Sequence, residues 1–173
     1  MSIEFPNSTA TAYDAQQTDE PFDAAWKEKT TAGNAAFDHG DHASAKAFYR
    51  DATDEAWRQF KRASAGIVGI AEDVAPMMVV CALNSARNFQ SLGHYAAMEH
   101  AFIATADVFL ATLSDAQAPK ALKNACILHF PKMLSEYRNL LSETRQDQVQ
   151  FDEYFRKARD ASISYHRSIT TLN

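Results

Sequence analysis

Residues 33–52 form the most informative stretch of the sequence and read GNAAFDHGDHASAKAFYRDA. In its first part, and just before it, small and apolar residues recur at three- and four-residue steps: Phe22, Trp26, Gly33, Ala36, Phe37. The pattern stops at Gly40, which suits a left-handed helix end, and Asp41 suits the N-cap of a following helix. A helical period then resumes at Ala45, Tyr49, Ala52. The stretch therefore predicts two helices joined by a tight turn.

In the second helix of this pair, the apolar line continues at helical spacing through Ile70, three residues before Asp73. We expect the helix to reach that residue, with a bend near Gly66 and Gly69. Proline is tolerated in a first helical turn, so Pro76 is expected to open the third helix. That helix should stop near Gly93.

The C-terminal half predicts three more helices, over 95–113, 119–141 and 151–172. Pro131 leaves two alternatives for the middle one, because proline either kinks a helix or separates two shorter helices, here at Phe130. The last helix carries a seam that alternates four- and three-residue steps, the spacing at which one helix packs along another. The seam residues are Phe151, Phe155, Ala158, Ser162, Tyr165, Ile169 and Leu172.

Composition agrees with an all-α chain. The 173 residues are 46% hydrophobic and 23% charged, which is ordinary for a folded domain, and the helix breakers are scarce at five glycines and five prolines. No stretch alternates with period two for long enough to predict a sheet. We expect a flexible acidic leader over 1–20, followed by a single helical domain over 21–173.

The turn region resembles a tetratricopeptide repeat. Small Gly33 and Ala45 stand where that repeat brings its paired helices close together, Gly40 stands at its turn, and Tyr49 and Ala52 stand where it fills the space between helices. The resemblance implies antiparallel helical hairpins that stack into an α-α superhelix. Small bacterial proteins with two divergent hairpins, a long linking helix and a helical tail look similar.

A weaker copy lies 53 residues further on, where Gly93 and Phe102 match Gly40 and Tyr49. In this copy Met98 replaces the small Ala45, and the spacing exceeds the 34 residues of a standard repeat. The helices over 119–141 and 151–172 then form either a third, degenerate hairpin or a helical cap on the stack. We expect the last helix to cap the stack, because a terminal repeat needs its open face covered.

The charge distribution argues against several partners. Of the net charge of −5, the first 25 residues carry five acidic side chains and no lysine or arginine, and the rest holds 17 acidic and 17 basic side chains. A near-neutral body with an acidic leader does not attract nucleic acid. The longest apolar stretches, 74–83 and 101–113, are shorter than a membrane span, and no secretory signal opens the chain. We therefore expect no membrane or nucleic-acid partner and a cytoplasmic location.

No pattern of catalytic or cofactor-binding residues is present. The sequence lacks a nucleophile elbow, a phosphate-binding glycine loop and a Glu-x-x-His pair. His39 with His42, and Cys126 with His129, have chelating spacing but no third ligand, and both cysteines are expected as reduced core thiols. We expect no enzyme activity, no cofactor and no metal.

The repeat resemblance instead implies a protein-interaction module whose first helices line a groove for a peptide. Asn34 and Asn84 match the two asparagines of the subgroup that clamps a C-terminal carboxylate, and Lys120 matches a basic position. Thr30 and Asn124 stand where that subgroup has Lys and Arg. Basic residues expected in the groove without forming the clamp are Lys27, Arg87 and Lys123.

The predicted function is thus a scaffold or adaptor that binds a protein or peptide. The alternative is a chaperone-like or structural homo-oligomer, such as a homo-dimer, in which the seam of the last helix pairs between chains. The residues that would pair are Phe151, Phe155, Tyr165 and Ile169.

Overall fold

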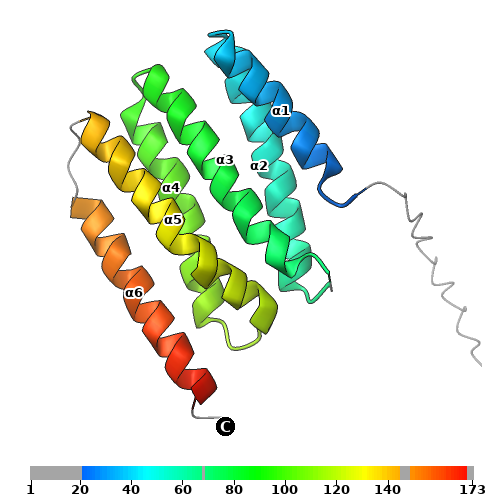
Figure 1. The fold of residues 1–173 in the computed structure, drawn as a ribbon, viewed down its shortest axis with the longest axis vertical. Helices are drawn as coiled ribbons and strands as arrows, with labels where there is room; N and C mark the ends of the chain where they lie inside the picture. Colours follow the sequence, from blue (N-terminus) through cyan, green and yellow to red (C-terminus); the bar gives the residue numbers. More distant parts are fainter. Residues whose placement is uncertain (1–20, 68, 145–148, 171–173) are drawn as a thin grey trace, which may run out of the picture.

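The computed structural model describes residues 21–67, 69–144 and 149–170, and in these ranges the chain is all-α, with six helices and no strand. Figure 1 shows the helices lying side by side along the long axis of the molecule. Their bounds are α1 Ala24–Asp38, α2 His42–Ser64, α3 Ala71–Ser91, α4 Tyr95–Ser114, α5 Lys120–Thr144 and α6 Val149–Thr170. The predicted leader, 1–20, lies outside the described residues.

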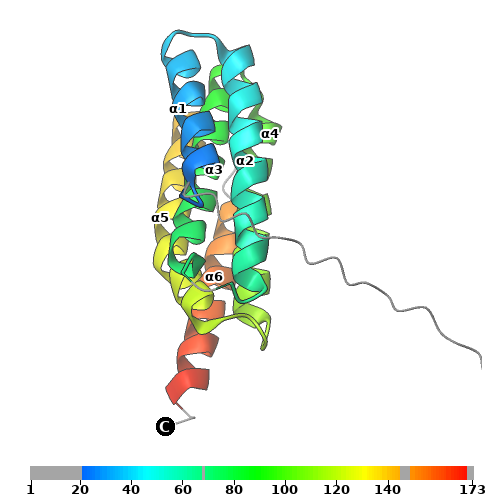
Figure 2. The same cartoon turned by 90° about the vertical axis from the view of Figure 1, so that its right-hand side faces the viewer.

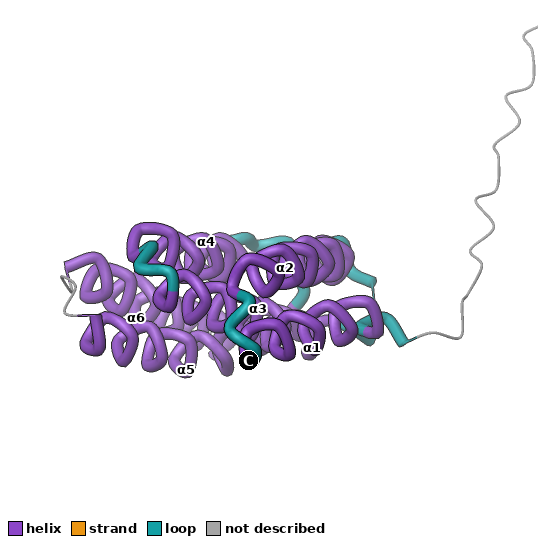
Figure 3. The backbone as a smooth tube through the Cα atoms, turned by 90° about the horizontal axis from the view of Figure 1, so that it is seen from above, coloured by secondary structure: helices purple, strands orange, loops and turns teal. Residues whose placement is uncertain are grey.

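The helices form two rows around a central α3. Seen from above, α1 and α5 lie in one row and α2 and α4 in the other (Figure 3), and the side view gives the same arrangement (Figure 2). Helix α3 packs on α1, α2, α4 and α5, whereas α6 packs on α4 and α5 at the end of the molecule. Successive helices therefore pack as neighbours, and α3 joins the N-terminal pair to the rest.

Aromatic rings link the helices through the core. Phe109 of α4 stacks on Phe60 of α2, with ring centroids 6.3 Å apart, and meets Phe130 of α5 edge-on at 5.5 Å. Phe102 of α4 stacks on Tyr137 of α5 at 4.6 Å. All five rings are at least 97% buried. Such pairs add to the free energy of apolar burial and fix α4 between its neighbours.

The first hairpin forms where the sequence predicts it. Gly40 takes a φ of +75° at the turn, and the Asp41 carboxylate caps α2 by accepting the backbone N–H of Ser44 at 3.0 Å. Hydrogen bonding by the Ser44 side chain, and then by the Ser44 backbone N–H, lowers the pKa of this carboxylate. Asn88 of α3 is buried and links α3 to His42, the first residue after this turn. Its Nδ2 donates to the His42 carbonyl at 3.0 Å, and its Oδ1 accepts from His42 Nδ1 at 3.1 Å.

The predicted boundary between the second and third helices is wrong. Helix α2 ends at Ser64 instead of reaching Asp73, because Gly66 and Gly69 have φ values of +85° and +92°, which no helix residue adopts. Helix α3 then begins at Ala71, five residues before Pro76, with two acidic residues in its first turn that favour a helix N-terminus. Helix α5 continues through Pro131 as one helix, so the alternative of two shorter helices does not hold.

Part of the predicted seam attaches α6 to the body. Phe151, Ala158 and Tyr165 are buried, and the Tyr165 hydroxyl donates to Asn124 of α5 at 3.0 Å. Phe155, however, is 51% exposed, although its ring stacks on Phe151. The side chains of the last two seam positions, 169 and 172, lie outside the described residues.

Helix α4 has the length and hydropathy of a membrane-spanning helix, the one such helix in the described part of the chain. Core helices satisfy the same criteria, and α4 packs against α3, α5 and α6. The two cysteines, Cys81 and Cys126, are free and buried, as predicted.

Candidate functional site

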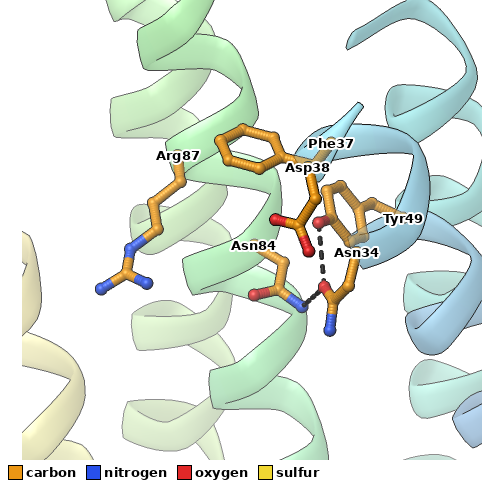
Figure 4. A pocket seen from close by; sticks show the side chains of 6 residues that line it. All are labelled: Asn34, Phe37, Asp38, Tyr49, Asn84 and Arg87. Carbon is orange, nitrogen blue, oxygen red and sulfur yellow. Dashed lines mark hydrogen bonds between the residues drawn. The ribbon is translucent and has the colours of Figure 1, made fainter. Parts of the chain in front are cut away.

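A cleft of about 280 Å³ opens between α1 and α3. Figure 4 shows the six side chains that line it: Asn34, Phe37 and Asp38 of α1, Tyr49 of α2, and Asn84 and Arg87 of α3. Three residues predicted to bind a peptide, Asn34, Asn84 and Arg87, thus come together here, although 50 positions separate the two asparagines in the sequence.

The approach of α1 to α2 positions the first of these residues. Gly33 is buried directly against the Tyr49 ring, so that a Cβ atom added at Gly33 would lie 2.5 Å from Tyr49 Cε1. The next residue, Asn34, is thereby placed beside the end of the same ring, where its Oδ1 accepts the Tyr49 hydroxyl at 2.9 Å. Burial, and secondarily the nearby Asp38 carboxylate, raises the pKa of Tyr49, which keeps this hydroxyl protonated as a donor.

The second asparagine completes a fixed amide pair. Asn84 Nδ2 donates to the same Asn34 Oδ1 at 3.3 Å, as the dashed lines of Figure 4 show. Asn34 Nδ2 and Asn84 Oδ1 have no hydrogen-bond partner among the described residues. The pair therefore offers one donor and one acceptor, the combination that a peptide group can satisfy with its own C=O and N–H.

A second cleft of about 290 Å³ continues the first one toward α5. The two share Phe37 and Arg87, and in Figure 4 the Arg87 side chain extends away from the asparagines toward α5. The other lining residues are Gln90, Ser91, Glu136, Asn139, Leu140 and Glu143. We call the two clefts together the α1/α3/α5 groove.

The α1/α3/α5 groove is acidic. Arg87 is the single cation among its described lining residues, and the Glu136 carboxylate lies 3.7 Å from the guanidinium. Asp38 and Glu143 add two further carboxylates, and Glu143 accepts a hydrogen bond from Gln90 at 3.0 Å. A surface with this balance attracts cationic groups and repels a carboxylate.

The three predicted lysines do not line the groove. Lys27 is exposed on α1 and pairs with Asp23 one turn earlier at 2.7 Å, and Lys120 is exposed at the first position of α5. Lys123 is only 9% exposed, because α6 covers it and its Nζ lies 5.8 Å from the centre of the Tyr165 ring. The expectation that Lys123 lines an open groove is therefore wrong.

The groove also contains residues that the sequence analysis missed. The sequence pattern predicts only packing roles for Phe37 and Tyr49, and Glu136 and Glu143 are not among the predicted site residues. A signal for the last two existed, since Glu136, Asn139 and Glu143 follow one another at three- and four-residue steps and so share one polar face of a helix.

Within the described ranges, no group of three or more His, Cys, Asp or Glu side chains could hold a metal ion. His39 Nδ1 bonds to the Ala35 carbonyl at 2.6 Å, so this histidine completes the end of α1. The Cys81 thiol accepts the Trp26 indole N–H at 3.2 Å, and burial raises the pKa of Cys81 to about 11 and that of Cys126 to about 12. Both cysteines are therefore protonated and unreactive at neutral pH.

Comparison with known proteins gives no relative: no family model, no curated protein and no solved structure matches this chain.

Proposed function

We propose that this chain is a tetratricopeptide-repeat-like interaction module, located in the cytoplasm and without catalysis, that binds a segment of a protein partner in the α1/α3/α5 groove. The observation that carries the proposal is the groove itself. Its lining comes from α1 and α3, the first helices of two successive hairpins, and from α5, with one side chain from α2. Repeats of this class bind their partners on the corresponding face.

The packing of the helices supports this assignment. In a stack of hairpins, each second helix packs on both its own first helix and the next one, and α2 packs on both α1 and α3 in this way. Helix α4 does the same with α3 and α5. In this proposal, α6 serves as the capping helix, held by Phe151, Ala158 and Tyr165.

The charges and the amide pair define the segment that fits. Asn34 and Asn84 bind one peptide group of an extended segment, and the carboxylates of Asp38, Glu136 and Glu143 favour lysine or arginine side chains beside it. A C-terminal carboxylate is disfavoured by the same carboxylates. The preferred ligand is therefore an internal, basic segment.

A peptide-display selection on the intact chain tests the proposal, with selected peptides remeasured as synthetic ligands by fluorescence anisotropy. We expect peptides rich in lysine and arginine, whose affinity falls about tenfold in Asn84→Ala. The double variant Glu136→Gln/Glu143→Gln should also weaken binding, whereas Glu72→Gln/Asp160→Asn, which removes two carboxylates elsewhere, should not. Equal losses in both double variants would contradict binding in the groove.

Apolar side chains on the two C-terminal helices favour a second candidate, a homo-oligomer assembled through α6. Phe155 and Ile163 of α6 are 51% and 43% exposed, and Leu128 of α5 is 73% exposed. Light scattering on the purified chain distinguishes the two functions. A dimer that Phe155→Asp converts into a folded monomer would support the oligomer, and a monomer at all concentrations would exclude it.

A further inference from the structure

A third cleft, of about 360 Å³, lies between α2, α3 and α4 and shares Tyr49 with the groove. Tyr49 lines both, since its hydroxyl reaches Asn34 while it also borders this cleft. The residues around the cleft are Lys46, Tyr49, Arg50, Thr53, Asp54, Ser85, Asn88, Phe89, Ala97, His100 and Ala101. The volume falls at the small end of the range of ligand-binding pockets.

The cleft has apolar walls, and the small side chains on α4 leave room for a ligand. Ala97 and Ala101 stand one turn apart on α4 and carry only methyl groups, so no side chain from these positions fills the hollow. The rings of Phe89 on α3 and Tyr49 on α2 add aromatic surface. A flat apolar group fits such walls, because it gains both area burial and ring contacts.

The polar groups around the cleft favour a negative charge. Lys46 Nζ lies 5.8 Å from the centre of the Phe89 ring, and none of the ion pairs between described residues includes this lysine. Arg50 adds a second cation, which pairs with its exposed sequence neighbour Asp51, and Asp54 is the single carboxylate among the described residues of the lining. Asp51 thus already neutralises Arg50, and Lys46 is the lining cation that a negatively charged ligand can pair with.

Some of the remaining polar side chains of the cleft already make hydrogen bonds within the protein, and others can donate a hydrogen bond to a ligand. Both polar atoms of the Asn88 amide bond to His42, and the Thr53 hydroxyl donates to the Tyr49 carbonyl at 2.7 Å. The Ser85 hydroxyl has no hydrogen-bond partner among the described residues, which leaves it able to donate to a ligand oxygen. His100 contributes a further nitrogen donor.

From this geometry we propose that the cleft between α2, α3 and α4 binds a small aromatic carboxylate. The ring lies against Phe89 and Tyr49, and the carboxylate lies near Lys46, with Ser85 as a hydrogen-bond donor. This site is separate from the α1/α3/α5 groove, so its occupancy does not depend on the proposed peptide function.

A titration of the ¹⁵N-labelled full chain with 2-naphthoate, followed by two-dimensional NMR, tests this site. The neutral isostere 2-naphthamide serves as the matched ligand. We expect saturable shifts of the backbone amides of Lys46, Ser85, Phe89 and Ala101 with 2-naphthoate, and at least tenfold weaker binding of the amide. Absence of saturable shifts, or equal affinity for the two ligands, would overturn the proposal.

Two variants and one control variant distinguish a loss of ligand binding at the cleft from a loss caused by misfolding or by a change in net charge. Ala101→Phe fills the cleft and should abolish binding, and Lys46→Gln, an exposed substitution that keeps the fold, should weaken 2-naphthoate about tenfold without affecting 2-naphthamide. Lys61→Gln removes a charge from the last turn of α2, outside the cleft, and should leave both affinities unchanged. If Lys46→Gln and Lys61→Gln have the same effect, the anion is held by the overall charge and the proposed site is wrong.

Discussion

Replacing Gly33 with alanine tests the closest approach of α1 to α2. The new Cβ atom would lie 2.5 Å from Tyr49 Cε1 and 2.6 Å from Cδ1, well inside van der Waals contact. The ring cannot retreat easily, because Tyr49 is only 4% exposed and its hydroxyl is bonded to Asn34. The substitution must therefore move either the ring or the helix.

Three effects set the magnitude. Alanine is a better helix former than glycine by about 1 kcal/mol, which stabilises the variant. Overpacking a filled contact costs about 1–3 kcal/mol, and disturbing the Tyr49–Asn34 hydrogen bond costs about 1 kcal/mol more. The free energy of unfolding should thus fall by about 1–3 kcal/mol, which lowers Tm by several degrees in a chain of this length.

Chemical denaturation followed by circular dichroism measures this change. Thr31→Ala is the matched control, because Thr31 is exposed on the same helix and should gain only a few tenths of a kcal/mol from helix propensity. In a Tyr49→Ala background the ring is absent, so Gly33→Ala should become stabilising by about 1 kcal/mol. A stabilising effect of Gly33→Ala in the parent chain would refute the close contact of Gly33 with Tyr49.

Three further outcomes are expected. Thr30→Val should raise the free energy of unfolding by up to about 1 kcal/mol, since the buried Thr30 hydroxyl has no partner in the described part of the chain. Thr53→Val should lower the free energy of unfolding, because it removes a hydrogen bond to the Tyr49 carbonyl. Urea unfolding of the two variants compares these effects. Asn88→Ala should destabilise by about 2–3 kcal/mol, because it leaves the turn before α2 without two hydrogen bonds, and a loss below 0.5 kcal/mol in the same assay would contradict that role. Cys81 and Cys126 should resist a thiol reagent at pH 8 until the chain unfolds. The native pKa values of these thiols, about 11 and about 12, lie above the unfolded thiol pKa of about 8.5. The two protonated thiols therefore contribute their full share of the free energy of unfolding below about pH 8.5, and that share is lost as the pH rises through the native pKa values. Measurement of Tm against pH checks this.

Local signals predicted the helices well where they were unambiguous. The turn at Gly40 and the helix over 95–113 follow from breakers and caps that act within a few residues, and the structure gives Tyr95–Ser114 for the latter. The boundary after Ser64 was missed because apolar residues continue at helical spacing through Ile70, which is buried although it precedes α3. The spacing of apolar residues shows which residues are buried, but it does not show whether a buried residue such as Ile70 lies inside a helix or in the loop before one.

The candidate site was predictable only in part. The shared cleft of Asn34, Asn84 and Arg87 was expected from the repeat resemblance, which implies that the first helices of successive hairpins line one face. Charge alone does not identify a face, and for that reason the prediction for Lys123, which lies under Tyr165, was wrong. The carboxylate of Glu136 enters the site through the packing of α3 on α5, a contact between positions about 50 residues apart that no local pattern encodes.

The most direct test of the central claim is to map where a selected peptide binds. The tightest peptide from the display selection is titrated into the ¹⁵N-labelled full chain, and the shifted backbone amides are assigned. We expect the largest shifts to fall on α1 and α3 around Asn34, Asn84 and Arg87, and on α5 around Glu136. Shifts confined to α6, or a selection that yields no peptide with saturable binding, would contradict it.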